Sequence, residues 1–246
     1  MGIDCVLFQR LTDLSRVIDT PERALMLGRQ GLHYQGRFVR FYKRVLVAND
    51  YEAVPRAMIR EGGFAEGMWE TLGYGHVESM DMSDFEAADH VHDLNTPVDT
   101  GLHGQFDFIF DGGTIEHVFN VPQALANVFN MLKEGGTFVS ANGMNGWYGH
   151  GLYQFNPDLV WSYWQRAAGC EVVQCVALPK DPTFPGVDMP DPATEGVRLR
   201  KLWQQLPRDQ IYLYYQIKKT KGAALTGPAM QSDYQNRWDK AAEAAE

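Results

Sequence analysis

Acidic side chains follow three apolar segments of this 246-residue sequence, at the points where each segment meets a turn. They are Asp81, with Asp84 of the same turn as its alternative, Asp93 and Asp111. A carboxylate at the end of a buried strand can accept hydrogen bonds from ribose hydroxyls or from the amino group of a purine. Aspartate also caps turns, and Asp93 is as well suited to an Asx turn as to a ligand. The sequence leaves both interpretations open.

A second group of polar residues could move protons. Glu116 and His117 follow Asp111 closely, and His150 lies in a loop at 142–156 that is rich in glycine and aromatic residues. Carboxylates and imidazoles act as general bases, and an unperturbed imidazole titrates near pH ~6.5. A histidine in such a loop can equally be held by a backbone carbonyl. We predict no metal ion here, because no third acid stands nearby.

Short apolar segments alternate with helical segments along the chain and position these residues. The expected strands cover residues 23–27, 76–80, 90–94, 106–110, 137–141, 170–178 and 211–217. The expected helices cover residues 3–20, 64–72, 121–132, 157–168 and 195–206. This alternation predicts an α/β fold with a doubly wound, mostly parallel sheet and an antiparallel edge. Ligands of such sheets bind beyond the carboxyl ends of the strands, where Gly28 and the three aspartates should meet.

The length of the chain suits one domain, which we expect over residues 1–220. Within it, residues 32–62 carry basic and apolar side chains at helical spacing, which predicts a helical insertion. Its basic face is either a solvated surface or part of a lid over a substrate. Residues 221–246 are rich in alanine and glycine and then polar, which predicts a loose tail.

Composition and charge exclude several classes of partner. The formal net charge of −9 argues against nucleic acid or an anionic membrane, because both attract clustered lysine and arginine. No apolar segment approaches the roughly 20 residues that span a bilayer. Cys5, Cys170 and Cys175 lack a metal-binding spacing and are expected to be reduced thiols of a cytoplasmic protein. The oligomeric state stays open.

Three segments resemble a known family. Residues 106–118 read FDFIFDGGTIEHV, residues 131–138 read MLKEGGTF, and residues 149–157 read GHGLYQFNP. Together and in this order they resemble the fourth and fifth strands of class I methyltransferases that use S-adenosylmethionine (SAM), and most of all the type 11-like group. The resemblance is good from about residue 73 to 178 and covers little of the rest.

The resemblance implies a seven-stranded Rossmann-like sheet with an antiparallel hairpin at one edge. It also implies SAM along the strand ends, with Gly28 near the methionine part, Asp81 on the ribose, and Asp93 and Leu94 beside the adenine. Asp111 and Gly112 would face the methyl donor. The resemblance thus supplies six cofactor-binding candidates: Gly28, Asp81, Asp93, Leu94, Asp111 and Gly112. Three residues of the neighbouring loops complete the set: Arg29, Gln30 and Ser83.

One departure from the family concerns the glycine-rich fingerprint after the first strand. Residues 25–31 read LMLGRQG, so Met26 replaces the usual acid and Gln30 replaces a glycine. Glycines there let the backbone approach the cofactor closely. Gln30 or Arg29 could compensate by binding the SAM carboxylate; alternatively, SAM affinity is low or lost.

Three functions follow from these observations. The first is an active SAM-dependent methyltransferase for an O or N atom of a small-molecule acceptor, with His150, His117 and Glu116 as candidate bases. The second is a methyltransferase-like binding or partner protein that no longer methylates, in which Arg29 or Tyr34 fills the cofactor groove. The third is a nicotinamide-dependent oxidoreductase, which the missing G-x-G-x-x-G disfavours. The acceptor is not specified by the sequence.

Overall fold

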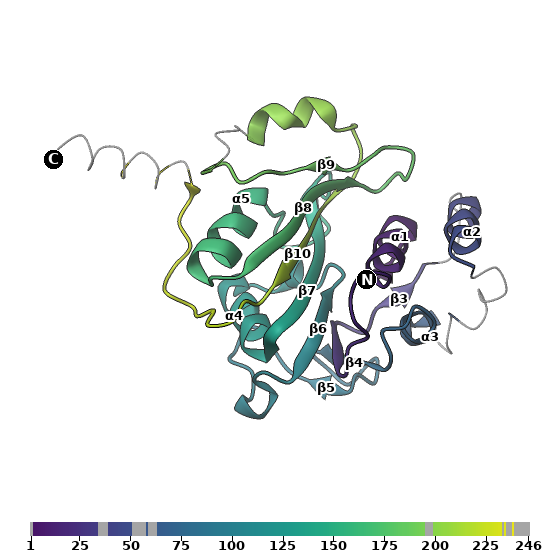
Figure 1. The fold of residues 1–246 in the computed structure, drawn as a ribbon, viewed down its shortest axis with the longest axis horizontal. Helices are drawn as coiled ribbons and strands as arrows, with labels where there is room; N and C mark the ends of the chain where they lie inside the picture. The colour runs from purple at the N-terminus through teal and green to yellow at the C-terminus, as the bar shows by residue number, and fades with distance from the viewer. Residues whose placement is uncertain are drawn as a thin grey trace.

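The computed structural model describes residues 2–33, 39–50, 58, 63–194, 199–232, 234 and 238. Its centre is an eight-stranded sheet with the order β5-β4-β2-β6-β7-β10-β8-β9 (Figure 1). The strands are β2 (Ala24–Leu27), β4 (Val77–Asp81), β5 (His90–Val91), β6 (Phe106–Asp111), β7 (Leu132–Asn145), β8 (Glu171–Pro179), β9 (Val187–Asp188) and β10 (Ile211–Lys218). A separate parallel pair joins β1 (Gly2–Ile3) to β3 (Gly31–Leu32).

The sheet is parallel from β5 to β7 and antiparallel at its other end. Strand β10 lies between β7 and β8 and runs antiparallel to both, and β9 runs antiparallel to β8. The predicted fold class, a doubly wound and mostly parallel sheet with an antiparallel edge, is confirmed. The strand count is eight instead of seven, because residues 187–188 of the expected connection pair with β8. Two residues are too few to produce an alternating pattern in the sequence.

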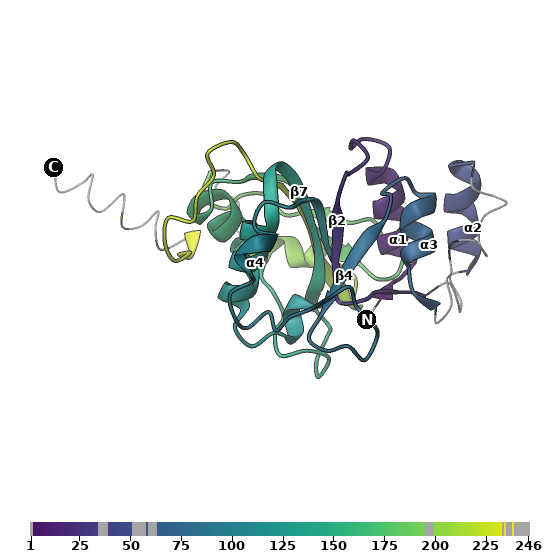
Figure 2. The same cartoon turned by 90° about the horizontal axis from the view of Figure 1, so that it is seen from below.

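Helices cover both faces of the sheet. Helices α1 (Cys5–Leu14), α2 (Val39–Ala48) and α3 (Glu66–Thr71) lie on one side, and α4 (Val121–Met131) and α5 (Pro157–Leu159) lie on the other (Figures 1 and 2). The expected helix 157–168 continues from α5 as a π-helix, η5 (Val160–Ala167). The described residues also form the 3-10 helices η3 (Thr100–Leu102), η4 (Ile115–His117) and η6 (Leu199–Gln205).

Two apolar cores form because successive residues of a strand point to opposite faces. Met26 and Phe110 pack with the helices of the first side, whereas Leu27 and Ile109 pack with α4 and η5. Burial on both faces explains why these strands read as continuous apolar runs. The sheet therefore fixes the directions in which its strand ends point.

Helix α2 lies within the predicted insertion at 32–62. It buries Tyr42, Val45 and Leu46 and packs on α1, so that α1 and α3 lie between it and the sheet (Figure 2). Residues 34–38, 51–57 and 59–62 of this insertion, Tyr34 included, lie outside the described residues. A lid role for the insertion stays a prediction.

The segment predicted as a tail makes specific contacts in its described part. The Thr226 amide donates to the Ala167 carbonyl at 2.9 Å. The Ser232 hydroxyl lies between Asp158 and Arg166 and is buried. In the part of the chain that the structure describes, no helix is long and apolar enough to cross a membrane.

Candidate functional site

The loops after three neighbouring strands meet at Gly28. Parallel pairing sets Leu27 of β2 beside Met80 of β4 and Asp111 of β6, so these strands end at one edge. Gly28 has a φ of +66°, and a Cβ atom on it would lie 2.7 Å from the Thr114 hydroxyl and 3.9 Å from a carboxylate oxygen of Asp81. Only glycine adopts this conformation without cost and tolerates so close an approach.

Asp81 and Ser83 occupy the loop after β4. One Asp81 oxygen, Oδ1, accepts a hydrogen bond from the Met82 amide at 2.6 Å, while Oδ2 is the atom near Gly28. Ser83 is exposed, and its hydroxyl accepts a hydrogen bond from the Phe85 amide at 3.4 Å. Asp81 thus keeps an oxygen for a ligand, whereas Ser83 takes part in the turn.

Asp93 and Leu94 follow β5 at the same edge. Asp93 Oδ1 accepts from the backbone amide of Asn95 at 2.9 Å and from its side-chain amide at 2.7 Å, which is an Asx turn. These hydrogen bonds lower the pKa of Asp93. Leu94 is buried, and its carbonyl accepts from the side chain of Asn127. Both alternatives for Asp93 remain compatible with this geometry, because Oδ2 is not used by the turn.

Arg29 is held by the loops around it. Its Nε lies 2.7 Å from Glu66 Oε1, and its Nη1 donates to the Glu86 carbonyl at 2.6 Å. The guanidinium also lies over the Phe64 ring, 4.1 Å from its centroid. Arg29 therefore connects the loops after β2 and β4 to the start of α3.

Gln30 is buried beside Gly112. Its amide nitrogen donates to the Leu27 carbonyl at 2.7 Å and to the Thr114 hydroxyl at 3.2 Å. Its Oε1 is buried and has no hydrogen-bond donor among the described residues. A Cβ on Gly112 would lie only 3.0 Å from this oxygen. A buried oxygen without a hydrogen-bond donor costs free energy of folding. No described residue supplies a donor to Gln30 Oε1.

Asp111 is fully buried, and four donors surround its carboxylate. Asn142 Nδ2 and Ser140 Oγ of β7 donate to Oδ2 at 2.6 and 3.0 Å, and the amides of Thr114 and Ile115 donate to Oδ1 at 2.7 and 3.3 Å. Burial raises the pKa of Asp111, and these hydrogen bonds oppose that rise. The structure thus places Asp111 as the anchor of the turn that starts η4, with its oxygens directed into the protein.

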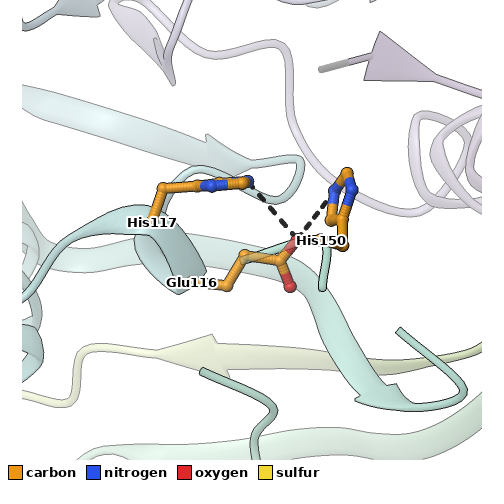
Figure 3. Close-up of side chains that lie close together, drawn as sticks. All are labelled: Glu116, His117 and His150. Atoms are coloured by element: carbon orange, nitrogen blue, oxygen red, sulfur yellow. Dashed lines mark ion pairs between the residues drawn. The ribbon is translucent and has the colours of Figure 1, made fainter. Parts of the chain in front are cut away.

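Glu116, His117 and His150 come together at the surface end of this network (Figure 3). Glu116 Oε1 lies 3.3 Å from His150 Nε2 and 3.7 Å from His117 Nε2. The other Glu116 oxygen, Oε2, accepts a hydrogen bond from the Gly143 amide. Burial raises the pKa of Glu116 to about 7, and burial together with the nearby His150 lowers the pKa of His117.

The Gly149-His150-Gly151 segment explains how His150 reaches Glu116. Gly149 has a φ of +73°, and a Cβ on Gly151 would lie 3.0 Å from the Glu116 carbonyl. That carbonyl accepts from the amides of Leu152 and Tyr153 at 2.9 and 3.1 Å. Two glycines therefore let the loop turn and lie directly on η4, and the histidine between them faces the carboxylate.

A cavity of about 130 Å³ adjoins this group. Gly112, Gly113, Glu116, Trp147 and His150 contribute to its lining, together with residues from the N-terminal segment and from β10: Asp4, His33 and Tyr212. The cavity connects the glycines expected to face the cofactor with the side chains expected to act on an acceptor. Trp147 is buried here, whereas Tyr148 is almost fully exposed.

The sequence predicted Asn142 at this edge, but not the contacts of Asn142, Ser140 and Thr114 that hold the site. Ser140 and Asn142 hold Asp111, the Asn142 side-chain oxygen also accepts from the Glu116 amide at 3.1 Å, and Thr114 joins Gln30 to β2. Asn142 was recognisable as a residue that follows an expected strand. Nothing in the local sequence marks Ser140 or Thr114, because their partners lie far away along the chain.

No family model matches the sequence, and no curated protein matches it. The chain is similar to solved structures of a SAM-dependent methyltransferase from Archaeoglobus fulgidus (11% identity, TM-score 0.48, 87% of this chain and 93% of that chain covered). It is also similar to the N-methyltransferase NodS from Bradyrhizobium japonicum (14%, 0.44, 87% and 94%). A third is the 1,6-didemethyltoxoflavin-N1-methyltransferase from Burkholderia thailandensis with bound S-adenosylhomocysteine (13%, 0.44, 87% and 78%). Identities and TM-scores this low assign no cofactor and no substrate to this chain.

Proposed function

We propose that this protein is a SAM-dependent methyltransferase that acts on an O or N atom of a small-molecule acceptor. The observation that carries the proposal is the convergence of Gly28, Asp81 and Gly112 at one edge of the sheet, next to Glu116 and His150. In open α/β sheets this edge is where ligands bind. The sequence resemblance to class I methyltransferases agrees with this location.

The residues along the edge fit the parts of SAM. Asp81 offers an oxygen for the ribose hydroxyls, and Gly28 and Gly112 leave the backbone open to close approach. The unpaired Gln30 oxygen suits the α-ammonium group of the methionine part. The Gln30 side chain does not suit the carboxylate of SAM, which needs a donor, because its amide nitrogen already donates to Leu27 and Thr114. When bound, SAM supplies a methyl group on a sulfonium with a good leaving group.

In this proposal, the acceptor binds beside Glu116, His117 and His150. Methyl transfer is an in-line displacement, so the chain's main task is to align the acceptor atom. The three side chains orient that atom and take part in the loss of its proton. Trp147 and Tyr212 pack against each other, with 4.9 Å between ring centroids, and give the cavity an apolar wall.

A methyltransferase-like protein without activity is a second candidate, and Gln30 favours it. Its side chain occupies the space next to Gly112, which a glycine at position 30 would leave open. Met26 also stands where relatives carry an acid. In this alternative, Gln30 blocks the methionine part of the groove and the edge serves another ligand or partner.

Calorimetric titration of SAM into the wild type, Asp81→Ala and Asp84→Ala tests the proposal. We expect binding to the wild type, binding at least about tenfold weaker to Asp81→Ala, and unchanged binding to Asp84→Ala. Asp84 lies exposed in the same loop and is the matched control. No heat from the wild type at millimolar SAM would exclude the first candidate. Formation of S-adenosylhomocysteine with any acceptor would exclude the second.

A cytoplasmic location belongs to this proposal. Cys5, Cys170 and Cys175 are all free and buried, which suits a compartment that keeps thiols reduced. The net charge of −9 likewise suits a small metabolite better than an anionic polymer as the acceptor.

A further inference from the structure

We propose that Glu116, His117 and His150 bind one divalent transition-metal ion of the zinc type. One ligand atom from each residue lies within 4.8 Å of the others. The three side chains come from η4 and from the loop after β7, and all of them face a common point (Figure 3). No third acid stands near Glu116 and His117 in the sequence, so no metal was expected, but the third ligand here is the histidine of a distant loop.

The distances suit a single ion after small side-chain rotations. Glu116 Oε1 is 3.3 Å from His150 Nε2 and 3.7 Å from His117 Nε2. Ligand atoms about 2.0–2.2 Å from a tetrahedral zinc ion lie about 3.3–3.6 Å apart. The distance between the ligand nitrogens of His117 and His150 is the one that has to shorten. Rotation is feasible because the His117 and His150 side chains are 38% and 41% exposed.

The ligand types select the class of ion. Two imidazoles and one carboxylate suit zinc, iron, cobalt or nickel, whereas magnesium and calcium require oxygen ligands throughout. Three protein ligands also leave a coordination position open, as in catalytic zinc sites. The cavity of about 130 Å³, which Glu116 and His150 line, provides room for a ligand at that position.

Among the described residues, the ion-pair partners of the Glu116 carboxylate are His117 and His150, which carry a positive charge only when protonated. The Glu116 side chain is only 3% exposed, and within the described residues no lysine or arginine forms an ion pair with it. A buried carboxylate without a counter-charge is unfavourable, and a dication would offset this cost. Lys180 lines the same cavity but lies over the Trp147 ring, 4.8 Å from its centroid, and donates to Gln210.

The orientation of Glu116 is fixed before any ion binds. The Gly143 amide holds Oε2, and Asn142 holds the backbone amide of Glu116. Oε1 is thereby left to face the two imidazoles. Such supporting contacts are typical of metal ligands, whose partners set their direction.

The role of the ion rests on the proposed function. The binding of the ion to Glu116, His117 and His150 does not depend on that function. With the ion bound, the three side chains would act on the acceptor through the metal and no longer as bases. This Lewis acid would bind a hydroxyl acceptor and lower the pKa of the hydroxyl, which favours attack on the methyl group. This narrows the acceptor class to small molecules with a hydroxyl group that can reach the open coordination position.

Metal binding is tested by titrating Zn²⁺ into chelator-treated full-length protein by calorimetry. We expect one site per chain in the wild type and affinity reduced at least about tenfold in Glu116→Gln, His117→Ala and His150→Ala. His103→Ala is the matched control, because His103 is exposed and precedes β6, whereas Glu116 follows that strand. The Zn²⁺ affinity of this variant should equal that of the wild type. No Zn²⁺ binding by the wild type, or equal binding by all variants, would overturn the proposal.

A second measurement keeps the test independent of folding defects. Co²⁺ bound to His150→Cys should show a thiolate-to-cobalt charge-transfer band that the wild type lacks, because residue 150 would then supply sulfur to the ion. Absence of this band in a folded, Co²⁺-treated variant contradicts the site. SAM titrations of the same proteins separate the two proposals, since loss of SAM binding with intact Zn²⁺ binding removes only the proposed function.

Discussion

Two parts of the strand-end edge differ in how their polar groups are satisfied. The cofactor half, formed by Gly28, Asp81 and Asp93, uses contacts within its own loops, such as Asp81 with Met82 and Asp93 with Asn95. The acceptor half, formed by Asp111, Glu116 and His150, uses contacts between distant elements. The acceptor half is therefore held together by the fold itself, whereas in the cofactor half Asp81 and Asp93 each keep one carboxylate oxygen outside these hydrogen bonds.

The largest effect should come from the centre of the acceptor half. Asp111→Ala removes the carboxylate that accepts hydrogen bonds from Ser140, Asn142 and Thr114, so we expect a loss of about 3 kcal/mol in the free energy of unfolding. Urea denaturation measures this loss. Asp93→Ala, the corresponding change in the cofactor half, should cost clearly less. Equal losses in the two variants would remove the difference between the halves.

A smaller effect is expected at Gln30, where the halves meet. If its free oxygen accepts a hydrogen bond from the cofactor's ammonium group, Gln30→Ala should weaken SAM binding about tenfold, as calorimetry can measure. Zn²⁺ binding by the same variant should not change, because Gln30 does not contact Glu116, His117 or His150. Tighter SAM binding by Gln30→Ala would instead identify the amide as an obstruction and favour the inactive candidate.

The smallest effect should come from the loop that carries His150. Gly151→Ala brings a Cβ to 3.0 Å from the Glu116 carbonyl, so the loop must move, and we expect a loss of about 1 kcal/mol on thermal or urea unfolding. Gly149→Asn is the control, because asparagine tolerates a positive φ and the added side chain meets open space. A larger loss from Gly149→Asn than from Gly151→Ala would show that loop conformation, rather than close packing on η4, places His150.

The sequence predicted the sheet better than the contacts at its edge. Strand β6 was recognisable, because burial on both faces leaves a run of apolar side chains that only Asp107 interrupts. Strand β9 was not, because two paired residues carry no period. The mostly parallel arrangement of the sheet followed from the alternation of strands with helices, not from any single residue.

Asp111 illustrates why the site was harder to predict. An aspartate after a buried strand looks the same in the sequence whether it faces a ligand or accepts hydrogen bonds from another strand. Here Ser140 and Asn142 of β7 decide the outcome, and their register opposite β6 is a property of the folded sheet. The approach of His150 to Glu116 was likewise invisible, although the two flanking glycines of His150 indicated a close turn.

We expect an adenosyl group to lie along the cofactor half with its sulfur towards Gly112. A crystal structure of the complex with S-adenosylhomocysteine tests it most directly. We predict ribose hydroxyls within hydrogen-bond distance of Asp81 and the sulfur atom between Gly112 and the cavity beside Glu116. Ligand bound instead in the cleft of about 750 Å³ at the opposite end of the sheet, where Glu22, Asp107 and Lys218 lie, would contradict the claim.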